Sequence, residues 1–202
     1  MTALSWPLWL QPSSVDFGLR RQTVQHQSQI TSQVQAYEIG AELWRMNITL
    51  PPRPRADAGS LEAFFNQLVG GTQTVLAWHF GRPVPLGTMR GAPVLGANAA
   101  QFARALRLSG LTPVGSEPIT LRAGDMLGVG GQLFQVAADA EADGGGGMTV
   151  QIVNRVRAAL ASGAAVTWNR PTSQFMVMES DGAFAHTVDT LAATSFTLME
   201  VR

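Results

Sequence analysis

The stretch over residues 42–80 constrains the fold most, because it predicts a strand, a helix and a second strand in that order. From Trp44 to Leu50 every second side chain is apolar, and polar residues such as Arg45 fall between them. This period of two is typical of a strand that is buried on one face. Consecutive prolines from Pro51 onward end the strand, because proline cannot donate a hydrogen bond to a sheet.

The helix is predicted over residues 57–69, with Asp57 or Ser60 as alternative N-terminal caps. Gly70 or Gly71 can supply the left-handed residue that ends it. Four apolar side chains recur at helical spacing and should pack on the sheet: Leu61, Phe64, Phe65 and Leu68. One amphipathic helix in a strand-rich chain predicts a mainly β fold, a β-sandwich with one covering α-helix.

A loop rich in glycine and proline over residues 81–93 predicts a domain boundary. The short strand-like pieces beyond it, with Gly130 and Gly131 as a two-residue hairpin turn, are typical of a small barrel or sandwich. Two last strands, expected over residues 183–188 and 194–201, should return to the first domain. The predicted layout is therefore a discontinuous domain from residues 1–86 and 179–202, with a small β-barrel-like domain inserted over residues 87–178.

Before the first predicted strand, the chain looks different. Residues 1–19 are expected to form an irregular apolar arm, and residues 20–30 a polar, glutamine-rich strand. Strands this polar are usually exposed on one side or paired with a neighbouring chain. We therefore predict a subunit interface at Arg21, Thr23, Val24, Gln25, His26 and Gln27.

Composition excludes several classes of function. The 202 residues are 46% apolar and carry a formal net charge of zero, which argues against a nucleic-acid surface held by bulk charge. There is no cysteine, so disulfides, zinc–thiolate sites and thiol catalysis are excluded. The N-terminus lacks the basic region of a signal peptide, and no apolar run is long enough for a membrane span.

The titratable residues do not predict an active site. His26, His79 and His186 lie far apart in sequence and lack metal-ligand spacing, so structural roles are favoured. Residues 139–144 resemble the start of an EF-hand loop, but Val150 stands where that loop needs a glutamate. A flexible hairpin tip is the favoured interpretation, with weak cation binding as the alternative. No catalytic, cofactor-binding or metal-binding residue is assigned.

Several segments, taken in order, resemble the distal tail proteins of phages with long, non-contractile tails. The most informative is Trp44-Arg-Met-Asn-Ile-Thr-Leu-Pro-Pro-Arg53, followed by Leu61-Glu-Ala-Phe-Phe65 and the Gly70-Gly71 pair. Together the similar segments cover most of residues 40–178. The remaining ones are Arg82-Pro-Val-Pro85, Arg90-Gly-Ala-Pro93, residues 121–134 and residues 153–168.

The resemblance implies a β-sandwich belt domain with one helix, of which six copies form a ring. A second domain, in some members an inserted oligonucleotide/oligosaccharide-type barrel, hangs outside the ring. The ring joins the tail tube to the hub and tip proteins and lets DNA pass through its lumen. The resemblance therefore implies a structural virion protein of the tail tip, made in the host cytoplasm, with no enzymatic activity and no cofactor. The first forty residues match no part of the pattern.

A second hypothesis is a carbohydrate-binding module that touches the host surface through the inserted domain. Trp78, Phe80 and Trp168 could stack on a sugar, although aromatic residues in apolar strands are more often core. An exposed aromatic platform would favour this hypothesis, whereas a polar strand buried in a ring would favour the first. A hydrolase is disfavoured because no nucleophile–base pair is visible.

Overall fold

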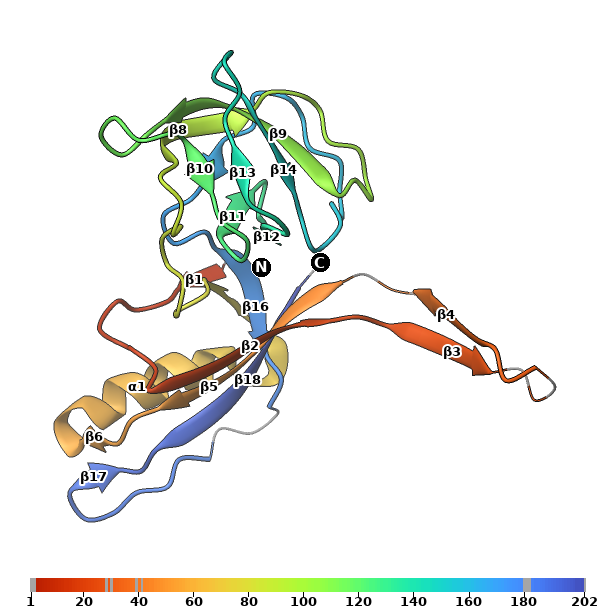
Figure 1. Ribbon diagram of the computed structural model, residues 1–202. Helices are drawn as coiled ribbons and strands as arrows, with labels where there is room; N and C mark the ends of the chain where they lie inside the picture. Colours follow the sequence, from red (N-terminus) through yellow and green to blue (C-terminus); the bar gives the residue numbers. More distant parts are fainter. Residues whose placement is uncertain are drawn as a thin grey trace.

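The fold is mainly β, with several sheets and one α-helix, as the sequence predicts (Figure 1). Among the described residues the sheets do not close into a barrel. None of the helices in that part of the chain is long and apolar enough to cross a membrane. The structure is a computed structural model that describes residues 3–27, 29, 31–38, 40, 42–179 and 183–201.

A six-stranded sheet organises the lower half of the molecule in Figure 1. Its neighbouring strands are antiparallel except the first two, which are parallel. In spatial order the strands are β1 (Ala3–Ser5), β7 (Thr74–Ala77), β16 (Ser173–Val177), β18 (Thr194–Glu200), β5 (Leu43–Leu50) and β2 (Ser14–Arg20).

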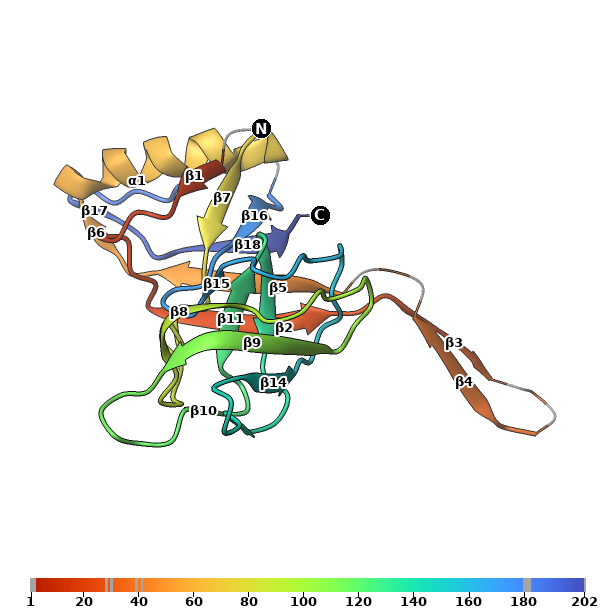
Figure 2. The ribbon, with the colours of Figure 1, turned by 90° about the horizontal axis from the view of Figure 1, so that it is seen from above.

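The predicted strand and helix are both present. In β5, the buried residues alternate with more exposed ones as expected. The helix α1 spans Arg55–Leu68 and packs on the buried face of the sheet (Figure 2). A 3₁₀ turn, η1 (Val69–Gly71), follows it, and Gly70 adopts the left-handed conformation at φ 78°. This backbone position explains the glycine, because side chains with a Cβ rarely adopt it.

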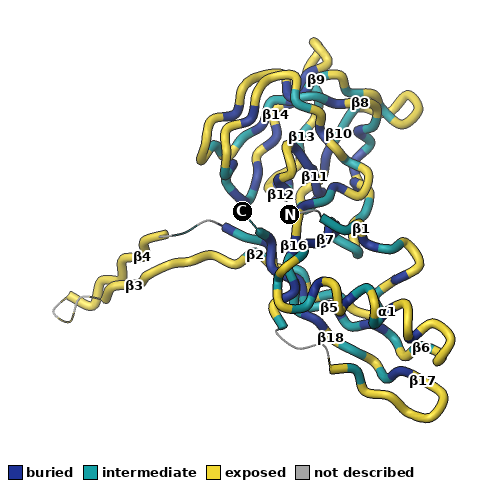
Figure 3. The backbone as a smooth tube through the Cα atoms, turned by 180° about the vertical axis from the view of Figure 1, so that it is seen from behind, coloured by how far each residue is buried: buried dark blue, intermediate teal, exposed yellow. Residues whose placement is uncertain are grey.

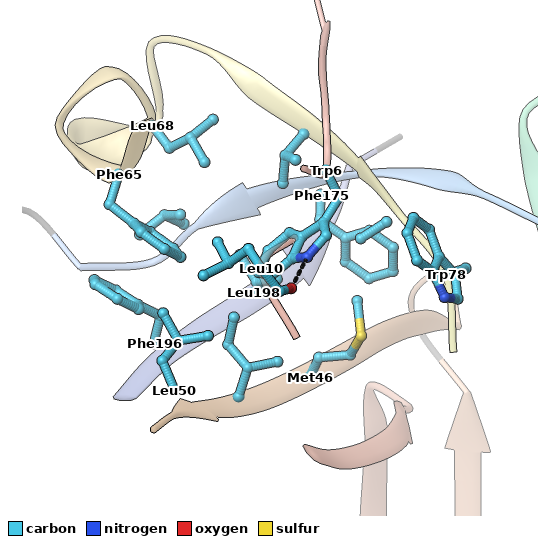
Figure 4. Packing of buried hydrophobic residues seen from close by; sticks show 14 of the residues in the cluster. Trp6, Leu10, Met46, Leu50, Phe65, Leu68, Trp78, Phe175, Phe196 and Leu198 are labelled. Atoms are coloured by element: carbon cyan, nitrogen blue, oxygen red, sulfur yellow. Dashed lines mark hydrogen bonds between the residues drawn. The ribbon is translucent and has the colours of Figure 1, made fainter. Parts of the chain in front are cut away.

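Aromatic side chains fill the core between α1 and the sheet (Figure 4). Phe65 stacks on Phe196 with ring centroids 3.9 Å apart, and Trp6 meets Phe65 edge-on at 6.1 Å. The Trp6 indole donates a hydrogen bond of 2.7 Å to the carbonyl of Leu10. The expectation of an irregular arm over residues 1–19 is therefore wrong: this segment supplies β1 and β2 and contributes buried side chains to the core.

The middle strands build a second apolar cluster above the sheet. The Gly130–Gly131 hairpin is confirmed, with φ angles of 56° and 74° between two antiparallel strands. Among the described residues these middle strands pair only with one another, in three small sheets. They are β8 (Arg90–Leu95), β9 (Ala105–Thr112), β10 (Thr120–Leu121), β11 (Met126–Val129), β12 (Gln132–Gln135), β13 (Ala140–Glu141), β14 (Met148–Gln151) and β15 (Val166–Thr167).

One predicted boundary is wrong. The inserted segment was expected to extend to residue 178, but β16 pairs with β7 and β18 inside the six-stranded sheet. Near the end of the chain, β18 pairs with β5, while β17 (Thr190–Leu191) pairs with β6 (Arg53–Pro54). The strand expected over residues 183–188 does not form; His186 makes only an isolated bridge with Leu191.

Two strands lie away from both halves. β3 (Thr23–Gln27) and β4 (Val34–Glu38) form a two-stranded hairpin that projects beyond the six-stranded sheet (Figures 1 and 2). β2 leads directly into β3, and β4 leads back into β5. The hairpin is therefore an extension of two adjacent strands of the sheet.

Candidate subunit interface

The projecting hairpin is the candidate functional site, and every residue of its two strands is exposed (Figure 3). Five pairs of residues face each other across the ladder, from Thr23 opposite Glu38 to Gln27 opposite Val34. An isolated two-stranded hairpin is marginally stable in water, because it has no face on which to bury apolar surface. Its free backbone edges are available to pair with another chain.

Apolar side chains on the hairpin face solvent. Val24 lies directly opposite Tyr37, and the two are 51% and 57% exposed. Val34, at the far end of β4, is 60% exposed. The Tyr37 hydroxyl donates a hydrogen bond of 2.7 Å to the Gln35 side-chain oxygen. An aromatic and a β-branched side chain paired in this way normally stabilise a sheet by packing, so their exposure marks a surface suited to a partner.

The structure places five of the six predicted interface residues on β3 itself. The sixth, Arg21, lies just before the hairpin and pairs with the Glu42 carboxylate at 3.2 Å. The predicted interface residues do not include β4, the second half of this surface. Its apolar residues Val34 and Tyr37 were the available signal.

Charged residues connect the base of the hairpin to the middle segment, residues 90–167, which contains the strands β8 to β15. The buried Glu42 carboxylate lies 3.5 Å from the Arg104 guanidinium and accepts a hydrogen bond of 2.6 Å from the Arg155 backbone N–H. The Glu38 carboxylate pairs with the Arg155 guanidinium and lies 3.9 Å from Arg104. Two arginines of the middle segment thus hold two carboxylates at the root of the hairpin.

A second buried carboxylate, Glu200, lies where the six-stranded sheet meets the middle segment. It accepts hydrogen bonds from Arg157 at 2.7 Å, from the Ser173 hydroxyl at 2.6 Å and from the Trp44 backbone N–H at 3.1 Å. Burial raises the pKa of Glu200, and Arg157 opposes that shift. The Trp44 indole also donates to the Leu133 carbonyl at 2.9 Å. The middle segment is therefore joined to the sheet by polar contacts as well as by apolar packing.

The three histidines are in different surroundings. His79 packs against the Phe17 ring at 4.4 Å, and burial lowers its pKa, with the nearby Arg82 charge acting in the same direction. His186 lies 2.8 Å from Glu62 of α1, and His26 is exposed on β3. In the part of the chain that the structure describes, no three metal-ligating side chains come together.

Both aspartates of the EF-hand-like segment have partners within the chain. Asp143 pairs with Arg107 and accepts hydrogen bonds of 3.0 Å from the N–H groups of Gly145 and Gly147. Asp139 accepts a hydrogen bond of 2.8 Å from the Ala123 N–H, and Arg122 lies 2.7 Å away. These contacts lower the pKa of both carboxyl groups. Backbone N–H groups that donate to aspartate side chains in this way are typical of turns.

The three aromatic residues considered for sugar stacking do not share one exposed surface. Trp78 is buried in the first core, 5.1 Å from the half-buried ring of Phe80. Trp168 packs against the second cluster and donates from its indole to the Gly91 carbonyl at 2.9 Å. Arg90 lies over its ring at 5.1 Å. Trp78, Phe80 and Trp168 therefore do not form the exposed aromatic platform that the carbohydrate-binding hypothesis needs.

Comparison with known proteins adds no relative from which a role could be transferred. No model of a known protein family matches the chain, and no curated protein matches it at a significant level.

Proposed function

We propose that this protein is a structural component of a phage tail tip, whose copies close into a ring through the β3–β4 hairpin. The single observation that carries the proposal is this hairpin: all residues of both strands are exposed, and Val24 and Tyr37 form an apolar pair facing water. A surface of this kind is suited to a neighbouring subunit, which would bury the apolar pair and complete the open strand edges.

The wider architecture agrees with the role that the sequence resemblance implies. The six-stranded sheet with α1 on one face would serve as the sandwich-like belt, and the middle strands, whose three small sheets do not close into a barrel, as the outer domain. Six copies would surround a lumen through which DNA passes, between the tail tube protein above and the hub and tip proteins below. The protein would then act by assembly in the virion rather than by catalysis.

The mass of the purified chain in solution tests the ring. We expect a particle six times the 21.5 kDa mass of the chain, measured by native mass spectrometry or light scattering. A head-to-tail contact whose rotation closes gives a ring, and one that does not close gives filaments. A chain that stays monomeric up to high concentration would refute the proposal.

Removal of the hairpin tests the interface. Because Thr23 and Glu38 lie opposite each other, residues 24–37 can be replaced by an Asn-Gly turn that joins the two strands directly. This variant should be monomeric and should melt at the same temperature as the native chain. Among the described residues β3 and β4 pair only with each other, and the variant keeps Glu38, which contacts Arg104 and Arg155. Val188→Ser is the matched control, because it removes an exposed apolar side chain elsewhere.

Proline substitutions in β3 distinguish backbone pairing between subunits from side-chain packing. Proline at both Val24 and His26 removes two backbone N–H donors from β3, and it should block assembly while sparing the middle segment. A ring of normal stoichiometry from this double variant would show that β3 does not pair across the subunit boundary.

A further inference from the structure

The uncovered face of the six-stranded sheet carries a hollow of about 760 Å³. Side chains alternate along a strand, so the residues of β5 between the buried ones point away from α1 and toward this face. The hollow runs beside β2, the last strand of the sheet. It is lined by Asp16, Phe17, Gly18, Leu19, Arg20, Arg45, Asn47, Met178, Glu179, Thr197 and Met199.

Two methionines give the hollow an apolar part. Met178 is 49% exposed, and Met199 comes from the adjacent strand β18. Methionine side chains are flexible and polarizable, so they fit aromatic and aliphatic partners of different shapes. Val24 and Tyr37 of the hairpin are partners of that chemical kind.

Two residues that line the hollow each have a buried side-chain oxygen without a hydrogen-bond donor. Asn47 Oδ1 and Glu179 Oε2 are buried, and neither accepts a hydrogen bond from the described chain. The other oxygen of Glu179 accepts one of 2.8 Å from the Thr197 N–H. A buried acceptor without a donor is unfavourable, so a ligand that brings N–H groups would be stabilised here after a small side-chain rotation.

The hairpin matches these requirements in chemistry and in length. β3 contains no acidic residue, and His26, on the same face as Val24, carries a ring N–H that can donate a hydrogen bond. It has five residues, and the part of β2 that lines the hollow, Asp16–Arg20, also has five. Each five-residue strand is about 17 Å long, at roughly 3.3 Å per residue. One strand of the hairpin therefore spans the hollow.

The hairpin cannot occupy the hollow of its own chain. It continues from the end of β2 and points away from the sheet (Figures 1 and 2). The exposed hairpin and the open hollow are thus two different surfaces of one chain, as a head-to-tail contact requires.

From these observations we infer that the hollow on the open sheet face receives the β3–β4 hairpin of a second copy of this chain. Val24 and Tyr37 lie on Met178 and Met199, and His26, which shares the face of β3 with Val24, faces Asn47 and Glu179. This inference rests on the proposed ring and identifies its second contact surface.

A mixing experiment tests the pair of surfaces. One variant lacks the hairpin, with residues 24–37 replaced by Asn-Gly, and keeps the hollow. The other is Met178→Asp, which keeps the hairpin and places a charge in the hollow. Each alone should be monomeric, but an equal mixture should form a dimer that grows no further, since it contains one intact hairpin and one intact hollow. Met178→Leu is the matched control and should still form the ring.

The outcomes distinguish the inference from the proposed function. If native chains form a ring and Met178→Asp also does, or if the mixture stays monomeric, the hollow is not the receiving surface although the ring stands. If native chains are monomeric at every concentration, the proposed function falls, and the inference falls with it.

Engineered cysteines give an independent measurement, because the chain contains none. Val24→Cys combined with Met178→Cys should give a ladder of covalent multimers on oxidation. The control pair is Gln25→Cys with Met178→Cys, because successive side chains of β3 point to opposite faces. It should give at least tenfold less product. Equal yields from the two pairs, or no ladder from native-like rings, would overturn the inference.

Discussion

At the scale of single residues, the buried carboxylate Glu200 contributes to the pH dependence of stability. Desolvation favours its protonated form, and this outweighs the favourable contacts with Arg157, Ser173 and the Trp44 N–H. The folded state therefore binds this proton more tightly than the unfolded state, whose carboxyl titrates near 4.5. The stabilising contribution is complete below that pH and is lost as the pH rises through the folded-state pKa.

Glu200→Gln should remove this pH dependence. The free energy of unfolding of the native chain, relative to the variant, should be highest in acid and should fall as the pH rises above about 4.5. Urea unfolding of both chains over a series of pH values measures it. Two parallel curves would show that Glu200 titrates normally in the folded protein.

Phe65 is the residue on which the packing of α1 most depends. It is fully buried between Phe196 and Trp6. Phe65→Ala should lower the free energy of unfolding by about 3–5 kcal/mol, because it leaves a cavity between the helix and the sheet. Phe65→Asp should unfold this half of the chain, since a charge would be buried without a partner. Gln67→Ala, on the exposed side of α1, is the control for denaturant unfolding.

At the scale of elements, strongly periodic segments could be predicted from the sequence, and segments held by distant partners could not. The alternation in β5 and the helical spacing in α1 reflect one buried face each, so local sequence predicts them. β1 offers no such pattern, because its place depends on parallel pairing with β7, some seventy residues away. β16 follows the middle strands in sequence but pairs with β7 and β18, and no local pattern indicates which sheet it joins.

The candidate interface was predictable only in part. The polarity of residues 20–30 indicated β3, since a strand without an apolar face needs another partner. The hollow could not be predicted, because Asp16, Asn47, Glu179 and Met199 come from four separate segments. Only the antiparallel pairing of β2, β5, β18 and β16 brings these residues to one face.

At the scale of the whole molecule, the base of the hairpin is tied to both halves. Glu42 is held by Arg21, by Arg104 and by the Arg155 N–H, so the direction of the hairpin depends on the middle segment. Glu42→Gln should weaken these contacts and cost about 1.5–3 kcal/mol of stability, the usual value for hydrogen bonds to a charged group.

The same variant should assemble less well than the native chain. A hairpin that samples more directions loses more entropy when it docks, so the concentration needed for half-assembly should rise several-fold. Analytical ultracentrifugation measures this concentration, with Glu117→Gln, on an exposed loop, as control. Unchanged assembly together with reduced stability would show that the carboxylate supports the fold without orienting the hairpin.

The direct passage of β2 into β3 has a mechanical consequence. A pull on a docked hairpin would be transmitted along β2, parallel to the strand axis. β2 is bonded to β5 over the seven residue pairs from Ser14–Thr49 to Arg20–Leu43. Such a load shears all of these bonds together instead of opening them one after another, because antiparallel ladder bonds run perpendicular to the strands. A ring linked in this way would resist tension best along the line that connects one subunit to the next.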